Sequence, residues 1–105
     1  MGELIPFDPK IHKPVYLDDS GVPSTEYLAS ETSPEGGAWN IPSIWFDSGT
    51  GKHQLLIGDF AWEEAFKYEK RTGKKFPRFD TIPMAVTAAK NRSNSGGAST
   101  KALAD

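Results

Sequence analysis

The sequence predicts a small α+β domain: a small antiparallel sheet of three to four short strands packed by two helices, with an extended N-terminal arm and a flexible C-terminal tail. The chain has 105 residues, enough for one domain with a single small core. Ten glycines and eight prolines indicate many turns. Short apolar segments precede residue 59, and helical periodicity follows it. We therefore expect an arm over 1–14, a compact domain over 15–93 and a Gly/Ser-rich tail over 94–105.

The arm is rich in proline. Pro6, Pro9 and Pro14 each lack a backbone donor and favour an extended conformation in the residue before them, which excludes a helix. The apolar side chains of the arm need cover, either from the body of the domain or from a neighbouring subunit, and we favour a neighbour. The candidate protein-binding residues of the arm are therefore Leu4, Ile5, Phe7 and Ile11.

The first strands are predicted just after the arm. Residues 15–17 form a short apolar run, and the Asp and Gly residues at 18–21 favour a turn. A loosely alternating return segment over 24–31 completes a hairpin. Residues 18–21 lack the alternating oxygen ligands and the distal glutamate of a calcium-binding loop, so a turn is the better interpretation of this segment.

A second group of strands surrounds the most apolar segment of the chain. The turn signal at 33–37 leads into a strand over 38–46, in which Pro42 donates no hydrogen bond. We therefore expect a sheet edge, a bulge or a bend at that proline. The turn at 47–51 precedes a short strand over 53–57.

A helix is predicted from Phe60 to about Thr72, with Asp59 as its N-cap. Gly73 stands where a left-handed residue ends a helix. One face of this helix carries apolar and aromatic side chains on adjoining helical rows, with one acid among them, and should pack on the sheet: Ala61, Trp62, Ala65, Phe66 and Glu69, with Tyr68 beside them.

A second helix follows an extended connector. Asp80 or Thr81 caps it, and Pro83 is tolerated in its first turn. Its small-residue face permits close packing and consists of Ile82, Ala85, Val86, Ala88 and Ala89. The Gly/Ser-rich segment 94–100 has too few apolar residues to build a core.

The charge of the chain is divided between its two parts. Residues 1–66 hold 11 acids and 3 bases, whereas residues 67–105 hold 3 acids and 9 bases. This polarity serves intramolecular packing, head-to-tail self-association or a basic contact surface. From the basic cluster we take Lys74, Lys75 and Arg78 as candidate protein-binding residues. Nucleic-acid binding is disfavoured because the first part of the chain is acidic.

The sequence contains few residues in patterns that support catalysis. The chain has no cysteine, and His12 and His53 lack metal-ligand spacing. The segment 48–52 lacks the first glycine and the final hydroxyl of a phosphate-binding loop. Glu63 and Glu64 suit the positive end of a helix dipole better than a pair of glycosidase carboxylates. We expect no enzyme activity, no catalytic residues, no metal and no cofactor.

Membrane insertion is also disfavoured, because no run approaches the roughly 20 apolar residues of a span and the N-terminus lacks a signal-peptide pattern. The large aromatic side chains are expected to form the core, with a sugar-stacking face as the alternative. These residues are Tyr27, Trp39, Trp45, Phe46, Phe60, Trp62 and Phe66.

Over about 70 residues the chain resembles a small module that recurs in tailed-bacteriophage proteins, either free-standing or appended to large virion-associated proteins, some with peptidoglycan-cleaving domains. The resemblance rests on six short motifs in order, at residues 23–26, 39–44, 63–65, 72–77, 79–81 and the alanine-rich segment that ends at 92–93. It implies an attachment or structural role in the particle and transfers no catalytic residues.

We therefore expect a virion-associated structural protein, located in the virion and in the host cytoplasm during assembly. Its expected partners are other phage virion proteins, bound through the arm and the tail, and a homo-oligomer within the particle is compatible with this role. Two alternatives come from other classes of protein. One is an accessory to a peptidoglycan- or glycan-directed enzyme, and the other is a phage-encoded inhibitor of a host protein.

Overall fold

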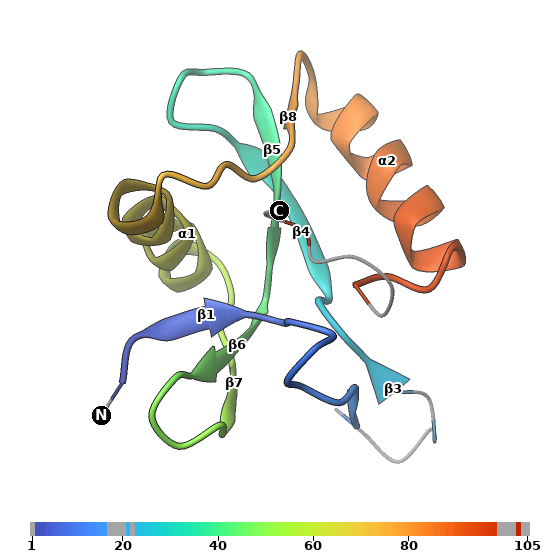
Figure 1. Cartoon of the computed structure of the whole chain (residues 1–105). Coiled ribbons are helices and arrows are strands. Elements are labelled where there is room, and N and C mark those ends of the chain that lie inside the picture. The colour runs from blue at the N-terminus through green and yellow to red at the C-terminus, as the bar shows by residue number, and fades with distance from the viewer. Residues whose placement is uncertain (1, 17–20, 22, 99–102, 104–105) are drawn as a thin grey trace.

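A computed structural model describes residues 2–16, 21, 23–98 and 103. Within these residues the chain forms the predicted α+β fold, with two helices and short antiparallel strands (Figure 1). The elements in chain order are β1 (Leu4–Pro6), β2 (Val15–Tyr16), β3 (Pro23–Ser24), β4 (Leu28–Thr32), β5 (Ala38–Pro42), β6 (Ile44–Asp47), β7 (His53–Leu55), α1 (Asp59–Thr72), β8 (Arg78–Phe79) and α2 (Ile82–Asn94).

The strands are divided among three small antiparallel sheets. Their orders are β1-β6-β7, β2-β3 and β4-β5-β8. The apolar segment predicted as one strand passes from one sheet to another, because β5 ends at Pro42 and β6 begins at Ile44. Of the sheet edge, bulge or bend expected at Pro42, the structure has a change of direction from one sheet to the next, and the proline's missing donor falls at the end of a ladder.

The two helices lie on opposite faces of the β4-β5-β8 sheet, as Figure 1 shows. Alternate residues of β5 point to opposite faces. Trp39 and Ile41 are fully buried in the cluster that includes Ala61 of α1. On the other face, Asn40 Nδ2 donates a 2.8 Å hydrogen bond to the carbonyl of Ala85 in α2. Strand β5 is thus the centre of the molecule.

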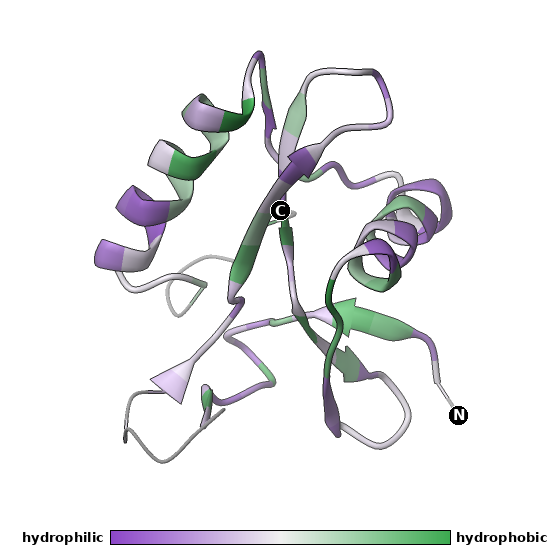
Figure 2. Ribbon diagram, turned by 180° about the vertical axis from the view of Figure 1, so that it is seen from behind, coloured by the Kyte–Doolittle hydropathy of each residue, from purple (hydrophilic) through white to green (hydrophobic). Residues whose placement is uncertain are grey.

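The aromatic core predicted from composition is present in part, around β5, β6 and α1. The prediction is wrong for Tyr27 and Phe60, which are 61% and 73% exposed. Trp39 and Trp45 are fully buried, and each meets Phe76 edge-on, with ring centroids 6.3 and 6.1 Å apart. Tyr68 completes this cluster. In Figure 2 the hydrophobic colouring gathers on the strands between the helices. Because these tryptophan faces are covered, they stabilise the fold by burial rather than offering a stacking surface.

The ends of the helices follow the expected chemistry with one correction. The prediction that Asp59 is the N-cap is wrong: Gly58 holds that position with a φ of 58°, and Asp59 is the first helical residue. A left-handed φ is accessible to glycine and disfavoured for aspartate, which explains the shift by one residue. Gly73 ends α1 with a φ of 77°, as predicted. Of the two caps left open for α2, Asp80 and Thr81, the structure has Thr81, whose side chain accepts from the amide of Met84.

Both ends of the chain contribute to its own core. Phe7 is 2% exposed and packs with Ile44, Phe46 and Ala98. The expectation that a neighbouring subunit covers the arm is therefore wrong for Phe7, because its own domain supplies the apolar partners. Leu103, from the predicted tail, is also buried. The remaining tail residues after Ala98, and residues 17–20 of the first predicted hairpin, lie outside the described residues.

Ion pairs connect the acidic and basic parts of the chain. Arg71 meets Glu3 at 2.9 Å, Arg78 meets Glu35 at 2.7 Å, and Arg92 meets Glu26 at 2.7 Å. Each pair joins a base from the second part to an acid from the first. Of the three uses left open for the charge asymmetry, the described residues realise intramolecular packing.

Candidate functional site

The apolar residues expected to bind partners are largely used within the chain. Leu4 and Ile5 belong to β1, which pairs with β6, and both are half-buried against the core. Phe7 is buried, as described above. Ile11 is 67% exposed and is the member of the set that stays available on the surface.

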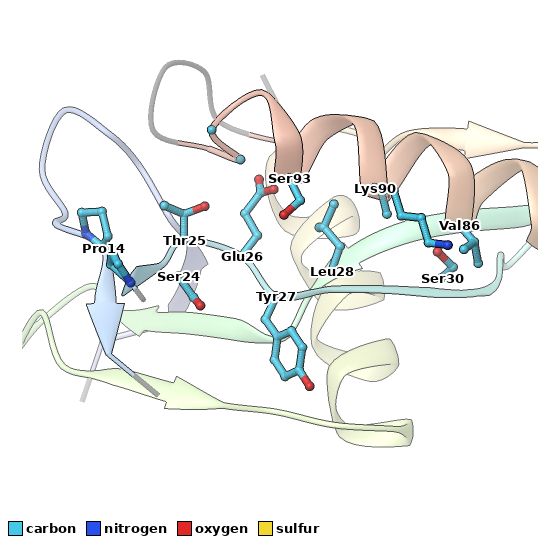
Figure 3. Close-up of a pocket in the computed structure, with 14 residues that line it drawn as sticks. Pro14, Ser24, Thr25, Glu26, Tyr27, Leu28, Ser30, Val86, Lys90 and Ser93 are labelled. Carbon is cyan, nitrogen blue, oxygen red and sulfur yellow. The ribbon is translucent and has the colours of Figure 1, made fainter. Parts of the chain in front are cut away.

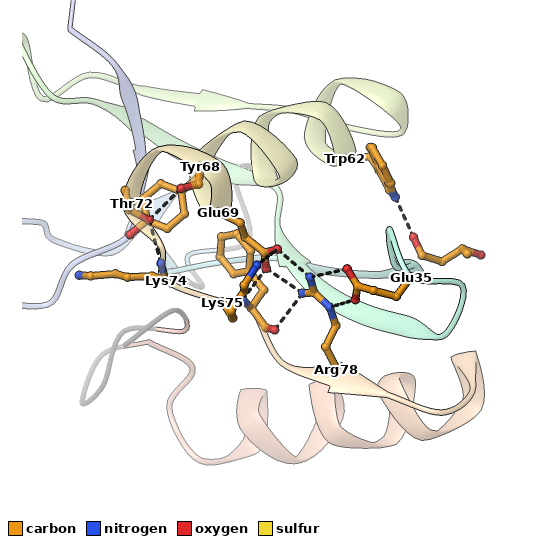
Figure 4. A network of polar contacts seen from close by, with 10 residues as sticks. Glu35, Trp62, Tyr68, Glu69, Thr72, Lys74, Lys75 and Arg78 are labelled. Carbon is orange, nitrogen blue, oxygen red and sulfur yellow. Dashed lines mark hydrogen bonds and ion pairs between the residues drawn. The ribbon is translucent and has the colours of Figure 1, made fainter.

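The basic residues expected to bind partners surround a buried carboxylate (Figure 4). The Arg78 guanidinium donates to both carboxylate oxygens of Glu69, at 2.7 and 2.6 Å, and its Nε donates to Glu35 at 2.7 Å. Lys75 Nζ lies 3.8 Å from Glu69, whereas the Lys74 side chain is drawn apart from this carboxylate. Arg78 therefore holds α1, the β4–β5 turn and β8 together.

The electrostatics of this cluster agree with its geometry. Hydrogen bonds that Arg78 donates to Glu69, with a further contribution from the one it donates to Glu35, raise the pKa of Arg78 above its ordinary value. The hydrogen bond from Arg78 in turn lowers the pKa of Glu35. The guanidinium carbon also lies 4.8 Å from the ring centroid of Trp39, a cation–π distance. Of the three basic candidates, Lys74 and Lys75 stay exposed and Arg78 is structural.

The described residues include no cluster of His, Asp or Glu side chains able to hold a metal ion. His12 Nδ1 accepts from the Asp8 amide at 2.8 Å, and its ring stacks 3.9 Å from that of Phe46. Partial burial lowers the pKa of His12.

The predicted turn at 47–51 is stabilised by Asp47 Oδ1, which accepts hydrogen bonds from the amides of Gly49, Thr50 and Gly2. No helix among the described residues is long and apolar enough to cross a membrane.

A groove of about 720 Å³ lies between α2 and the segment that contains β3 and the start of β4 (Figure 3). Its apolar surface comes from Leu28 of β4 with Val86 and Ala89 of α2. Lys90 adds an exposed ammonium group. The rest of the lining is made by prolines 14 and 23, by glycines 96 and 97, and by the polar residues Ser24, Thr25, Glu26, Tyr27, Ser30 and Ser93.

A buried ion pair fixes one end of the groove. Two guanidinium nitrogens of Arg92, Nε and Nη2, each donate to Glu26 at 2.7 Å, and the Glu26 side chain is 4% exposed. The Glu26 carbonyl accepts from the amides of Ser43 and Ile44, at the junction between β5 and β6. This two-point contact holds the end of α2 over the sheet, so the groove is held open by the fold itself.

The backbone is unusual at the floor of the groove. Tyr27 has a φ of 49°, a left-handed conformation that is uncommon for an aromatic residue. Figure 3 shows Glu26 and Leu28 directed toward α2 and Tyr27 directed away from it. The Tyr27 side chain is 61% exposed, so this large ring does not belong to the core.

A second exposed surface lies along β7, at one edge of the β1-β6-β7 sheet, and at the start of α1. We call it the β7 edge and define it as His53, Leu55, Ile57 and Phe60. Leu55, Ile57 and Phe60 are 48%, 66% and 73% exposed. Strand β7 ends the order β1-β6-β7, so its outer side meets no further strand of that sheet. Single exposed apolar residues are ordinary, but three within six positions form a surface suited to contact with protein.

Comparison with known proteins gave no match among family models, curated proteins or solved structures.

The groove was not predicted from the sequence, because it depends on residues far apart in the chain. Glu26 and Arg92 are separated by 66 positions, and neither belongs to a local motif that marks a partner. The β7 edge was not predicted either. Phe60 is among the aromatic residues expected in the core, but it is 73% exposed.

Proposed function

We propose that this chain is a non-catalytic, protein-binding component of a bacteriophage particle that seats an extended segment of another virion protein in the groove beside α2. The setting rests on the resemblance to phage modules. The mode of binding rests on the groove, which is the single observation that carries the proposal. The arm and the tail, first expected to hold partners, supply core residues, so a surface of the folded domain takes over that role.

The chemistry of the groove suits a short extended peptide. Its volume of about 720 Å³ is within the range of specific ligand sites. The groove has one apolar contact surface, formed by Leu28, Val86 and Ala89. Lys90 lies one helical turn after Val86 in α2. We therefore expect the bound segment to carry an apolar side chain and a carboxylate in neighbouring positions, the carboxylate meeting Lys90.

Two matched variants test this mode of binding. Val86→Asp places a charge in the groove, whereas Met84→Asp places the same charge on an exposed position of α2 that does not line it. Both variants are supplied during growth of the phage that encodes the chain, in place of the wild-type protein. We expect Val86→Asp to reduce incorporation into purified particles at least about tenfold, the loss of one buried apolar anchor, and Met84→Asp to leave it unchanged.

Equal incorporation of the two folded variants into particles would show that the groove is not the binding site.

A cell-wall turbidity assay tests the non-catalytic part of the proposal. Lysis by the purified chain that disappears in Glu63→Gln or Glu64→Gln would replace it with an enzymatic function.

A further inference from the structure

The backbone of β7 has a free side with a regular pattern. The amide of Leu56 donates to the Ser43 carbonyl at 2.7 Å, and the Asp47 amide donates to the Lys52 carbonyl at 2.9 Å. In an antiparallel pair such contacts alternate, so positions 52, 54 and 56 face β6. The backbone groups of His53, Leu55 and Ile57 therefore point away from β6, and they have no hydrogen-bond partner among the described residues.

This edge is short but has few of the other features that prevent strands from pairing. Residues 53–57 contain no proline, no lysine and no bulge, and all three residues of β7 are exposed. His53 and Leu55 share one face of β7, and Ile57 lies two positions beyond the end of that strand. An exposed edge with apolar side chains is a template for another strand.

We propose that the β7 edge pairs antiparallel with the β7 edge of a second copy of this chain. With Leu55 opposite Leu55 of the second copy, His53 lies opposite Ile57 and Ile57 lies opposite His53. In this register each residue whose backbone groups point away from β6 lies opposite another such residue of the second copy. His53, Leu55 and Ile57 therefore each form a hydrogen-bonded pair across the contact. The arrangement is a twofold contact that joins two three-stranded sheets into one of six strands.

Charge complementarity favours a second copy as the occupant. Continued beyond the end of β7, the same register brings Lys52 to the turn at Gly58 of the other molecule, where Asp59 begins α1. Both side chains belong to exposed residues, and the twofold axis produces this opposite-charge contact twice. The edge strand of a different protein, without these charges, would make neither of the two Lys52–Asp59 contacts.

Sedimentation equilibrium from micromolar to several hundred micromolar protein tests the pairing. We expect wild-type dimers that Lys52→Glu and Asp59→Lys each weaken by about tenfold, since each reverses two symmetry-related contacts. The double variant restores the opposite charges and should return the dissociation constant to within about threefold of wild type. A monomer over the whole range, or a double variant no better than the singles, would overturn the proposal.

Amide hydrogen exchange supplies a second readout with residue resolution. We expect the amides of His53, Leu55 and Ile57 to become more protected as protein concentration rises, while those of Gln54 and Leu56, which face β6, do not change. Protection that rises equally at all five positions would contradict edge pairing. Val86→Asp should leave self-association intact, so failure of the groove proposal and failure of this one are distinguishable.

Discussion

Arg78→Met tests how the acidic and basic parts of the chain are held together. The substitution keeps most of the side-chain length but removes the donors to Glu69 and Glu35. Glu69 is 3% exposed and retains the amide of Phe76 at 2.8 Å and Lys75 Nζ at 3.8 Å. It would thus be a buried carboxylate that has lost its main partner.

The expected magnitude follows from this geometry. Removing one partner of a buried ion pair costs about 3–5 kcal/mol. The Arg78 side chain is 27% exposed and Glu69 keeps two contacts, so we expect the low end, about 3 kcal/mol. The contact with Glu35, which is 63% exposed, adds at most a few tenths of a kcal/mol. For a domain of this size the melting temperature should fall by about 12–20 °C.

Urea unfolding followed by tryptophan fluorescence, together with thermal melts by circular dichroism, measures this loss. Lys67→Met is the matched control, because it removes a cation from an exposed position of α1. Adding Glu69→Gln to Arg78→Met removes the stranded charge and should recover part of the stability. A free energy of unfolding for Arg78→Met within about 1 kcal/mol of wild type would show that the Arg78–Glu69 ion pair does not hold the fold together.

Three further outcomes follow from the fold. Phe7→Ala should cost about 3–5 kcal/mol in urea unfolding, because Phe7 lies in the chain's own core; a loss below 1 kcal/mol would mean that the site is not packed. Gly73→Ala should cost about 1–2 kcal/mol through its left-handed φ, whereas a neutral result would contradict that conformation. Burial lowers the pKa of His12, so its stabilising contribution is complete above about pH 6.5 and is lost as pH falls below it. The urea midpoint of wild type should therefore drop more between pH 7.5 and 5.5 than that of His12→Gln, and parallel curves would argue against this.

Local signals were sufficient to predict most elements of the fold. The glycine at the end of α1 and the break in the strand at Pro42 each follow from the backbone preferences of one residue. The sequence left the cap of α2 open between Asp80 and Thr81, both of which have a side-chain oxygen that suits that position. The error at Asp59 was a choice between two neighbouring residues that both suit a helix start. It was decided by a left-handed φ that the sequence alone does not display.

Long-range contacts account for what the sequence did not predict. The apolar arm was assigned to a neighbour because local patterns do not reveal that Ala98, from the predicted tail, returns to pack beside Phe7. The groove depends in the same way on the meeting of Glu26 and Arg92. Charge arithmetic indicated that the two parts of the chain attract, but the pairing of individual residues required the fold.

The proposed role is tested most directly by quantitative mass spectrometry, after lysine-directed cross-linking, of purified phage particles from a culture in which this chain is expressed. We expect the chain to be present at a constant ratio to the virion proteins. We also expect Lys90, on the rim of the groove, to be cross-linked to one of them. Absence of the chain from particles that contain every other virion protein would contradict the proposed role.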